Sequence, residues 1–384
     1  MSPSQKVCVI TTVHPPFDTR IFHKEIQSLV SYGYEVTLIA QHEGEEQVSG
    51  VTIISLPKVK SPFKRMLSLN SKAFLVALKQ DADVFHFHDP ELIFVGALLK
   101  LLTRKKVFYD VHENVPKQIL NKEWIKPWLR KLLSGVYRLG ERMTLPFIDK
   151  IIIAEDSYWD NYANFKEKVV AVKNYPLLSY SKTAPLDEAK GNGPVRLIYV
   201  GRLSKIRGIM EILEALLILV NEKKHDNLVL DVIGTGSDEL LKEITTFIDT
   251  HELGRLVNLH GQMPHDEVYS YLYKSNIGLA ILHPDPNYVE SLPTKMFEYM
   301  STKLPVIASD FPLWAGILKN SKCGITVDPL DPNKIADAIE YLLNNHGICV
   351  KMGENGRRAV EEKFSWEVEQ GRLLTVYKEL LGDK

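Results

Sequence analysis

The sequence lacks the features that mark several classes of protein. It has three cysteines, Cys8, Cys323 and Cys349, without CxxC spacing, which excludes a disulfide framework or a cysteine zinc site and suggests a reducing compartment. It has no run of about 18 apolar residues, so it predicts no membrane span. Its formal net charge of −1 argues against a dedicated nucleic-acid binder.

Length and composition fit a globular chain of two domains. With 45% hydrophobic and 25% charged residues the composition is ordinary, and 384 residues exceed the size at which one hydrophobic core keeps growing. The first residues, MSPSQKVCVITTV, alternate like a strand and lack the small-residue cleavage site of a signal peptide. We therefore expect a cytoplasmic protein.

Short β-branched runs alternate with longer helical patterns along the chain, which is typical of βαβ units and a parallel sheet buried on both faces. The alternation stops near Asn174 and restarts at VRLIYV, after a stretch rich in Pro, Ser, Gly and charge. The pattern predicts an α/β protein with two Rossmann-like domains that face each other across a ligand cleft. We place these domains at residues 1–175 and 195–365, the linker at 176–194, and a helix at about 366–384 that packs back on the first domain.

Positive charge gathers in the first half of the chain, where residues 1–180 carry 24 Lys and Arg against 19 Asp and Glu. Residues 58–79 contain six basic residues and no acidic ones, and residues 117–142 contain seven basic and two acidic residues with Trp124 and Trp128. Basic amphipathic helices with tryptophans lie in the interface of anionic bilayers. The alternative is a solvated basic face whose apolar side lies in the core.

The glycines do not predict a dinucleotide site. A G-x-G-x-x-G fingerprint would follow the first strand, but that strand runs into Val13–Pro16 without a glycine. Gly234 and Gly236 follow a later strand and lack the third glycine, although they would let the backbone approach a phosphate or a sugar closely.

The second domain opens with the cationic loop GRLSKIRG, in which Arg202, Lys205 and Arg207 follow a strand. Cations between a strand and a helix are well placed for a diphosphate, and arginine offers two parallel hydrogen bonds to phosphate. The alternative is a solvated loop.

The stretch ESLPTKMFE joins a loop to a helix, with Ser291 as the expected N-cap and Pro293 in the first helical turn. The free N–H groups of such a helix start form an anion site. Glu290 precedes the helix, and Glu298 lies one turn beyond Thr294 on the same face. Two carboxylates could hold hydroxyl groups on either side of a diphosphate; helix capping alone would explain one glutamate.

Together, GRLSKIRG and ESLPTKMFE resemble the retaining glycosyltransferases of family 4, which have the GT-B fold of two facing Rossmann-like domains. The resemblance implies that Glu290 is catalytic and contacts the donor sugar, and that Glu298 binds the ribose. It implies that Arg202 and Arg207 bind the diphosphate and that Gly261 lies against the base. The remaining donor-binding residues that we expect are Gly234, Gly236, Ser291, Leu292, Pro293 and Thr294.

Motifs in the first domain, HPPFDTRIFHKE, HFHDPEL and YDVHENVPKQIL, resemble the subgroup that builds bacterial lipopolysaccharides and exopolysaccharides. HPPFDTR departs from the family pattern, because it replaces the glycine-rich loop that many members carry after the first strand. Asp18 and Arg20 of this stretch are acceptor-binding candidates. His86 and His88 share one face of a strand, point towards the predicted cleft and are further acceptor-binding candidates, although a lone histidine is more often structural. His112 matches a family histidine near the reacting sugar, which implies a catalytic role.

No metal or other cofactor is expected. Asp81-Ala82-Asp83 has the D-x-D spacing of metal-dependent transferases, but it precedes a strand and is interpreted as a turn. Positive side chains and a helix N-terminus can neutralise the leaving diphosphate without a metal.

The predicted function is transfer of a hexose or N-acetylhexosamine from a nucleoside-diphosphate sugar, in first place a UDP-sugar, to a lipid-linked or oligosaccharide acceptor. The predicted location is the inner face of the cytoplasmic membrane, bound to anionic lipid through segments 58–79 and 117–142, with no nucleic-acid partner. The alternatives are a GT-B UDP-sugar epimerase or hydrolase, a GT-B phosphorylase, and a non-catalytic sugar-nucleotide-binding module.

Overall fold

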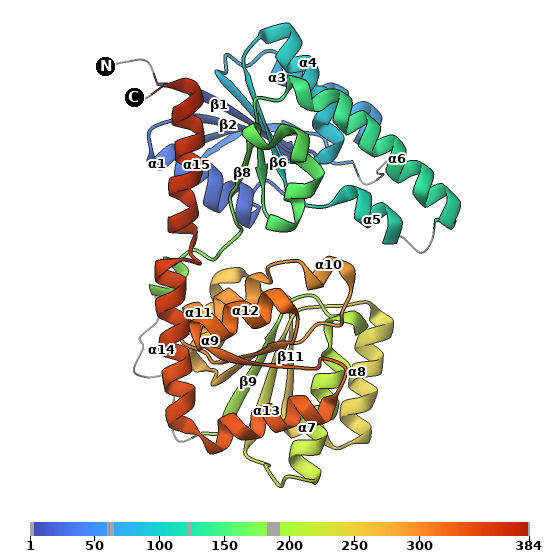
Figure 1. The fold of residues 1–384 in the computed structure, drawn as a ribbon, viewed down its shortest axis with the longest axis vertical. Helices are drawn as coiled ribbons and strands as arrows, with labels where there is room; N and C mark the ends of the chain where they lie inside the picture. The colour runs from blue at the N-terminus through green and yellow to red at the C-terminus, as the bar shows by residue number, and fades with distance from the viewer. Residues whose placement is uncertain (1–3, 60, 62–64, 122–124, 183–192, 383–384) are drawn as a thin grey trace. The chain divides into compact units, whose positions relative to one another are not determined.

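The computed structural model describes residues 4–59, 61, 65–121, 125–182 and 193–382. The chain forms two compact units, shown in Figure 1. Unit 1 comprises Met1–Asn174 and Trp366–Lys384, and unit 2 comprises Tyr175–Ser365.

The sheet of unit 1 has eight strands in the order β3-β4-β2-β1-β5-β6-β7-β8. All neighbours are parallel except β3 and β4, which are antiparallel at one edge. The sequence analysis missed β3, whose three polar-flanked residues EQV show no strand periodicity. The strands are β1 (Lys6–Ile10), β2 (Glu35–Gln41), β3 (Glu46–Val48), β4 (Val51–Leu56), β5 (Val84–Phe87), β6 (Lys106–Val111), β7 (Lys150–Ile153) and β8 (Val169–Ala171).

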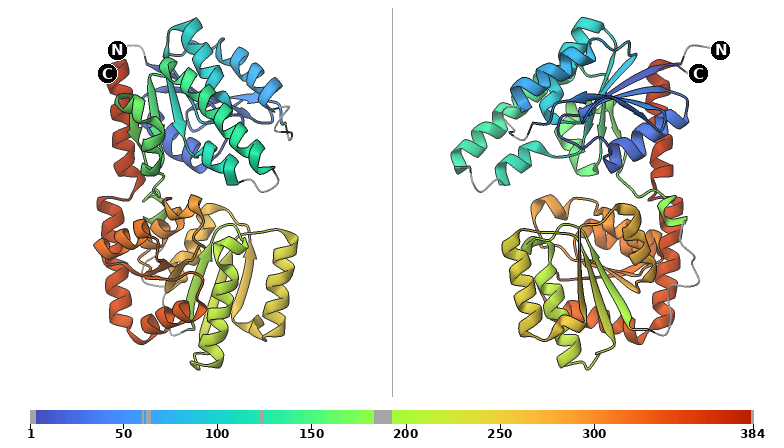
Figure 2. Two further views of the ribbon diagram at one scale, coloured as in Figure 1. Left: turned by 45° about the vertical axis from the view of Figure 1, so that its right-hand side comes forward. Right: turned by 180° about the vertical axis from the view of Figure 1, so that it is seen from behind.

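Helices flank this sheet, and the inward-facing residues of both form a continuous apolar core (Figure 2). The helical segments are η1 (Thr19–Ile26), α1 (Gln27–Ser31), η2 (Arg65–Leu69), α3 (Asn70–Ala77), η3 (Pro90–Leu92), α4 (Ile93–Thr103), α5 (Val115–Asn121), α6 (Pro127–Thr144), η4 (Leu145–Phe147), η5 (Asp156–Lys168) and α15 (Trp366–Leu381). The C-terminal helix α15 belongs to this unit: Trp366 Nε1 donates to Ser28 Oγ at 2.9 Å, and the Glu369 carboxylate accepts from the Lys173 N–H.

The sheet of unit 2 has six parallel strands in the order β11-β10-β9-β12-β13-β14. The order reverses between β9 and β12, and in doubly wound folds ligands bind beyond the carboxyl ends of the strands at such a point. The strands are β9 (Val195–Val200), β10 (Leu228–Ile233), β11 (Val257–Gly261), β12 (Ile277–Ala280), β13 (Val306–Ser309) and β14 (Gly324–Val327). The predicted α/β class with two parallel sheets is confirmed.

Helices cover both faces of the second sheet, and two apolar clusters fill the space between them. The helical segments are η6 (Tyr180–Lys182), η7 (Lys205–Arg207), α7 (Ile209–Asn221), α8 (Asp238–Thr250), η8 (Leu253–Arg255), α9 (His265–Lys274), α10 (Pro286–Val289), α11 (Thr294–Ser301), α12 (Pro312–Ser321), α13 (Pro332–Asn344) and α14 (His346–Glu362). Tyr175, which the sequence placed at the end of the first domain and just before the linker, belongs to unit 2, where its ring lies 4.8 Å from that of Phe297. Residues 183–192 of that linker, and Lys60, Lys64 and Trp124 of the basic segments, lie outside the described residues.

Candidate functional site

Three glycines stand at the carboxyl ends of neighbouring strands in unit 2. Gly201 donates its N–H to Ile233 O at 2.9 Å, and Gly234 donates its N–H to Gly261 O at 2.8 Å. A Cβ on Gly234, where φ is +144°, would lie 1.9 Å from Gly201 O. The glycine is therefore required by the close approach of the chain's own loops.

A glycine is required at position 236 for the same reason, since a Cβ there would lie 2.9 Å from Leu203 O. The two glycines predicted to approach a ligand thus first allow the loops after β9 and β10 to pack together. Their predicted contact with a donor stays a prediction.

The two arginines predicted to bind a diphosphate lie side by side in one depression of about 490 Å³, which is also lined by Ser237 and Tyr288. Arg202 is exposed, whereas Arg207 is half-buried and donates from Nε to Tyr288 Oη at 3.3 Å. Lys205, between them in the sequence, is bonded to Glu243 at 2.9 Å. The loop therefore offers two arginines to an anion.

Helix α11 begins at Thr294, with Pro293 at its N-cap. Ser291 does not cap it, contrary to the sequence analysis, because Pro286–Val289 forms the short helix α10 and Ser291 donates from both N and Oγ to Tyr288 O. An adjoining pocket of about 330 Å³ is lined by Val200, Gly201, Arg207, Leu282, Tyr288, Ser291, Leu292, Pro293, Thr294, Lys295 and Glu298. Most predicted donor-binding residues of the motif therefore meet Arg207 around one pocket.

The two glutamates of the motif have different surroundings. Glu290 ends α10 and is exposed, and it is not among the residues that line this pocket. Glu298 is 7% exposed and bonds through Oε1 to His265 Nε2 at 2.8 Å. His265 is a pocket neighbour that sequence reasoning missed, because it belongs to α9, far from the motif in the chain.

Lys295 is the second residue that sequence reasoning missed, although it stands inside the motif. Its residue is 9% exposed, and its Nζ lies 3.9 Å from the centroid of the Tyr199 ring. Within the described part of the chain Nζ has no hydrogen-bond partner. Burial and the nearby Arg207 lower the pKa of Lys295 to about 7, against the opposing effect of Glu298.

In unit 1 the predicted residues Arg20, His86 and His88 lie in a buried cluster with Asp110 and Glu25. Arg20 Nη2 donates to both oxygens of Asp110, at 3.1 and 3.0 Å, and Arg20 Nε lies 2.8 Å from Glu25 Oε1. Burial alone would raise the pKa of Asp110, but Arg20 and then His112 hold it well below its ordinary value. Burial and the neighbouring Asp110 raise the pKa of Glu25 well above its ordinary value, so one arginine and one proton balance the two carboxyls.

The histidines of this cluster form hydrogen bonds with other side chains. His86 Nδ1 bonds to Tyr377 Oη at 2.8 Å and His88 Nδ1 bonds to His112 Nε2 at 3.2 Å. Burial lowers the pKa of both, that of His86 to about 4. Arg20, His86 and His88 are at most 4% exposed, so they lie beneath the surface, and their contact with an acceptor stays a prediction.

This cluster could also be considered as a metal site, because Glu25, His86, His88 and Asp110 offer four ligand atoms within 4.8 Å of one another. Arg20 already pairs with both carboxyls, which supplies the positive charge that an ion would bring. The D-x-D pair lies at the opposite end of β5, where Asp81 pairs with Lys6 and Asp83 with Lys105. The expectation of no metal stays a prediction.

A more exposed group lies above the cluster. Asp18 caps η1 by accepting from the N–H groups of Arg20 and Ile21, and lies 3.6 Å from His14. Although burial opposes the shift, His14 and backbone donors lower the pKa of Asp18 to about 2. The His14 ring lies 5.3 Å from that of His112, which bonds to Asp110 at 3.1 Å. His14, which sequence reasoning missed, is therefore the partner of the predicted catalytic His112 at the surface.

Helix α6 presents its apolar side to solvent, so the interpretation of segment 117–142 as a basic face with its apolar side in the core is wrong. A stripe of five apolar side chains is 54–66% exposed, while the residues that α6 buries are Ser134, Glu141 and Thr144. The exposed stripe consists of Trp128, Leu132, Val136, Leu139 and Met143.

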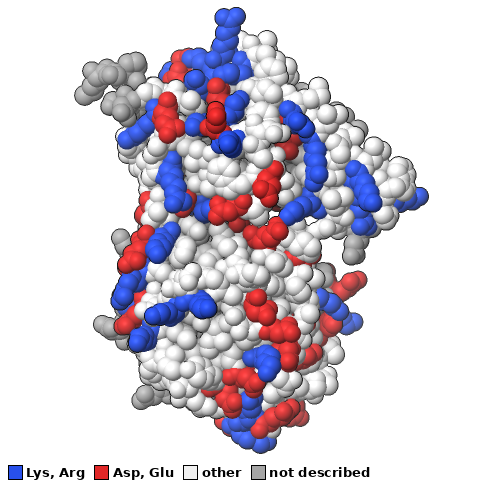
Figure 3. All heavy atoms as spheres, in the orientation of Figure 1, with Lys and Arg blue, Asp and Glu red and all other residues white. Residues whose placement is uncertain are grey.

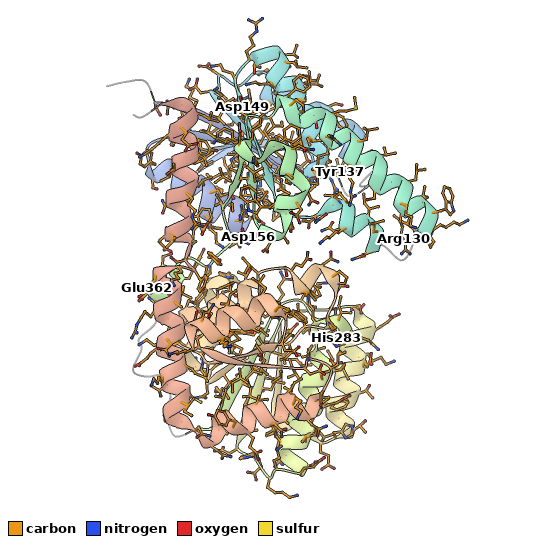
Figure 4. All side chains as sticks on the ribbon, viewed as in Figure 1. Arg130, Tyr137, Asp149, Asp156, His283 and Glu362 are labelled. Atoms are coloured by element: carbon orange, nitrogen blue, oxygen red, sulfur yellow. The ribbon has the colours of Figure 1, made fainter. Side chains whose placement is uncertain are left out.

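The exposed basic residues of α6 are Lys131, Arg138 and Arg142. The space-filling view shows basic side chains among uncharged ones over this part of unit 1 (Figure 3). Two residues of α6, the basic residue Arg130 and the aromatic residue Tyr137, are labelled in Figure 4. Tyr137, Phe94 and Leu133 line an adjacent groove of about 1020 Å³, whose walls are mostly apolar. Across the described residues, no helix is both long and apolar enough to cross a bilayer.

The two Rossmann-like units, and the 330 Å³ pocket at the start of α11 (called the donor pocket from here on), fit the class of glycosyltransferases that use sugar nucleotides. Family comparisons agree: residues 7–172 match the model of "Glycosyltransferase Family 4" and residues 183–359 match that of "Glycosyl transferases group 1". The chain belongs to the glycosyltransferases of family 4, with the GT-B fold.

The relatives are distant. The capsular polysaccharide biosynthesis glycosyltransferase CapM of Staphylococcus aureus is 27% identical over 185 residues, which are 48% of this chain and 46% of CapM. The aligned part thus spans about half the length of CapM and of most of the other curated relatives, whereas the glycosyltransferase MJ1607 of Methanocaldococcus jannaschii aligns at 22% identity over 98% of this chain and 100% of its own length. Among solved structures, sucrose-phosphate synthase of Thermosynechococcus elongatus gives a TM-score of 0.75 at 19% identity, over 98% of this chain and 99% of that one. Anabaena HepE in complex with UDP and glucose gives 0.73 at 14% identity, over 98% and 100%.

Proposed function

We propose that this protein is a retaining hexosyltransferase that transfers a hexose or N-acetylhexosamine from a UDP-sugar to a lipid-linked or oligosaccharide acceptor in the synthesis of a bacterial surface polysaccharide. The observation that carries the proposal is the position of Arg207 at the switch point of unit 2, where it lines one depression with Arg202 and an adjoining pocket with the start of α11. Arginines and free helix N–H groups together suit the diphosphate of a sugar nucleotide.

Each candidate residue has a separate role in this proposal. Arg202, Arg207 and the N-terminus of α11 stabilise the leaving diphosphate, and Glu298, held by His265, accepts hydrogen bonds from the ribose hydroxyls. Glu290 orients the donor sugar, and an acceptor hydroxyl attacks the oxocarbenium-like sugar from the face that the diphosphate leaves. His112 lies beside the acceptor hydroxyl. UDP and glucose in the structural relative HepE support a UDP-sugar as donor.

The exposed stripe on α6 supports an acceptor at a membrane. A soluble helix normally buries its apolar side, whereas α6 exposes it beside Lys and Arg residues such as Lys131 and Arg138. This combination matches an anionic bilayer, in which the apolar stripe enters the headgroup region and the cations meet lipid phosphates. A UDP-sugar epimerase would have no use for such a face, which favours the transferase over that alternative. CapM, a capsular polysaccharide enzyme by name, fits the same kind of acceptor.

A thermal-shift panel of UDP-, GDP- and ADP-sugars tests the proposal. A donor at about 100 times its Kd stabilises the folded protein by about 2.7 kcal/mol. We expect the UDP-sugars to raise the melting temperature most. A melting temperature that no sugar nucleotide raises would contradict the proposed function.

A further inference from the structure

The donor pocket contains a buried cation to which the roles above give no task. Lys295 is 9% exposed, lines the pocket, and its Nζ has no hydrogen-bond partner within the described residues. Burying an ammonium without hydrogen bonds is costly, so an orphaned buried group of this kind needs an explanation. An anionic ligand would supply the missing partner.

The groups that face this ammonium come from three elements, and the charges of Arg207 and Glu298 offset each other, so a charged Lys295 is left without a counter-charge of its own. The Tyr199 ring of β9 lies beneath it, and an atom at the Cβ position of Gly201 would lie 3.6 Å from Nζ and 3.8 Å from Arg207 Nη1. Two cations therefore flank one glycine at the end of β9. Glu298, the nearby carboxylate on α11, is bonded to His265.

We propose that Lys295 binds a phosphate oxygen of the donor diphosphate together with Arg207, and that its amine takes up a proton from solvent as the diphosphate enters. The inference rests on the proposed function, since it names a further residue of the same donor site. The N–H bond forms on the lysine amine, and the buffer supplies the proton.

The direction of proton transfer follows from the site. Burial and Arg207 lower the pKa of Lys295 to about 7, so at pH 8 most molecules of the free protein carry a neutral lysine. A diphosphate beside the amine favours its charged form and raises that pKa again. Binding at pH 8 therefore takes up close to one proton, and binding at pH 6 takes up far less.

Isothermal titration of UDP, GDP and ADP into the full chain at pH 8 tests this, in two buffers with different ionisation enthalpies. For wild type we expect the heat of UDP binding to depend on the buffer by an amount that reports proton uptake. In Lys295→Met we expect affinity to fall about 10- to 100-fold, the loss typical of a hydrogen bond to a charged group, and the buffer dependence to vanish. Lys274→Met, a change at an exposed lysine of α9, is the matched control and should bind like wild type.

The possible failures are distinct. Wild-type affinity in Lys295→Met, or a heat of wild-type binding that is the same in both buffers, overturns the role of Lys295 and leaves the proposed function standing. The wild-type heats need no variant, so they decide the matter even if Lys295→Met does not fold. Absence of binding by all three nucleotides to wild type overturns the proposed function and this inference with it.

Discussion

The two units build the same strand order around their first strand but treat the end of that strand in opposite ways. In unit 1 the loop after β1 donates the N–H groups of Thr12 and Val13 to the carboxylate of Asp89, which follows β5. In unit 2 the loop after β9 carries two arginines, and Lys295 lies beside it without a hydrogen-bond partner within the described residues. In unit 1 the carboxylate of Asp89 thus occupies the position at the end of the first strand, whereas in unit 2 the corresponding position is lined by cations that an anionic ligand could bind.

The same contrast appears in the buried cations. Arg20 in unit 1 bonds to Asp110 and lies 2.8 Å from Glu25, so its charge is balanced within the fold. Near Lys295 in unit 2 lie the Tyr199 ring, a second cation, Arg207, and a carboxylate, Glu298, that is already bonded to His265. A buried cation that is paired with carboxylates of the fold stabilises the free protein. A buried cation without such a partner instead stabilises the complex with an anionic ligand. This difference supports the proposal that the donor binds to unit 2.

The largest expected effect is the loss of stability on replacing Arg20, the cation that is paired with Asp110 and Glu25. Arg20→Met leaves two buried carboxyls without their cation, so we expect the free energy of unfolding of unit 1 to fall by about 3–5 kcal/mol. Urea denaturation followed by circular dichroism measures it. Arg142→Met, at an exposed position of α6, is the control. A loss no larger than the control's would mean that the buried network is not the support described above.

Glu290→Ala should have a different outcome, because Glu290 is exposed and its assigned task is to orient the donor sugar. We expect turnover to fall about 100-fold or more, the cost of misplacing a reacting group, while the melting temperature stays unchanged. Release of UDP from a UDP-sugar that binds in the thermal-shift panel measures it. Wild-type turnover would remove Glu290 from the mechanism.

The unbalanced cation should make stability depend on pH. The unfolded state binds a proton on Lys295 up to about pH 10.5, while the folded state loses it near pH 7, so stability rises with pH between these values. From pH 7 to pH 9 wild type should gain about 2 kcal/mol relative to Lys295→Met, because each unit of pKa shift corresponds to about 1.4 kcal/mol. Parallel denaturation curves of the two proteins at both pH values would reveal a gain, and the same difference at each pH would exclude a lowered pKa for Lys295.

The smallest expected effect concerns the outer surface of unit 1. Val136→Asp places a negative charge in the exposed stripe of α6, so we expect binding to vesicles that contain anionic lipid to weaken about 10-fold. Vesicle co-sedimentation measures it, and neutral vesicles together with Tyr341→Asp, at an exposed site on unit 2, serve as controls. Equal binding by Val136→Asp and wild type would show that α6 does not meet the membrane.

Much of the fold was predictable because parallel strands buried on both faces form short β-branched runs, and each predicted run became a strand. The edge strand β3 was missed because its residues are largely exposed and polar. For the donor pocket, the sequence indicated Arg207, Thr294 and Glu298, which share two short motifs. It could not indicate His265, since distant segments meet only in the folded sheet.

Burial was the property that sequence reasoning judged least well. The alternating pattern correctly placed His86 and His88 on one face of a strand, but it could not indicate which helices cover that face. Helices α15 and η1, from opposite ends of the chain, cover it. Likewise, the helical pattern of α6 was visible, but which side faces solvent depends on neighbours that the pattern does not name. Lys295 was overlooked because a lysine in a helix is usually exposed.

We propose above all that unit 2 recognises a nucleoside diphosphate through the cations at its switch point. Titration of UDP and of uridine into the wild-type protein, at the same pH and salt concentration, tests it most directly. We expect UDP to bind and uridine, which lacks the diphosphate, to bind at least about 100-fold more weakly, since several charge-assisted hydrogen bonds are lost. Equal affinity for the two, or no measurable affinity for UDP, would contradict it.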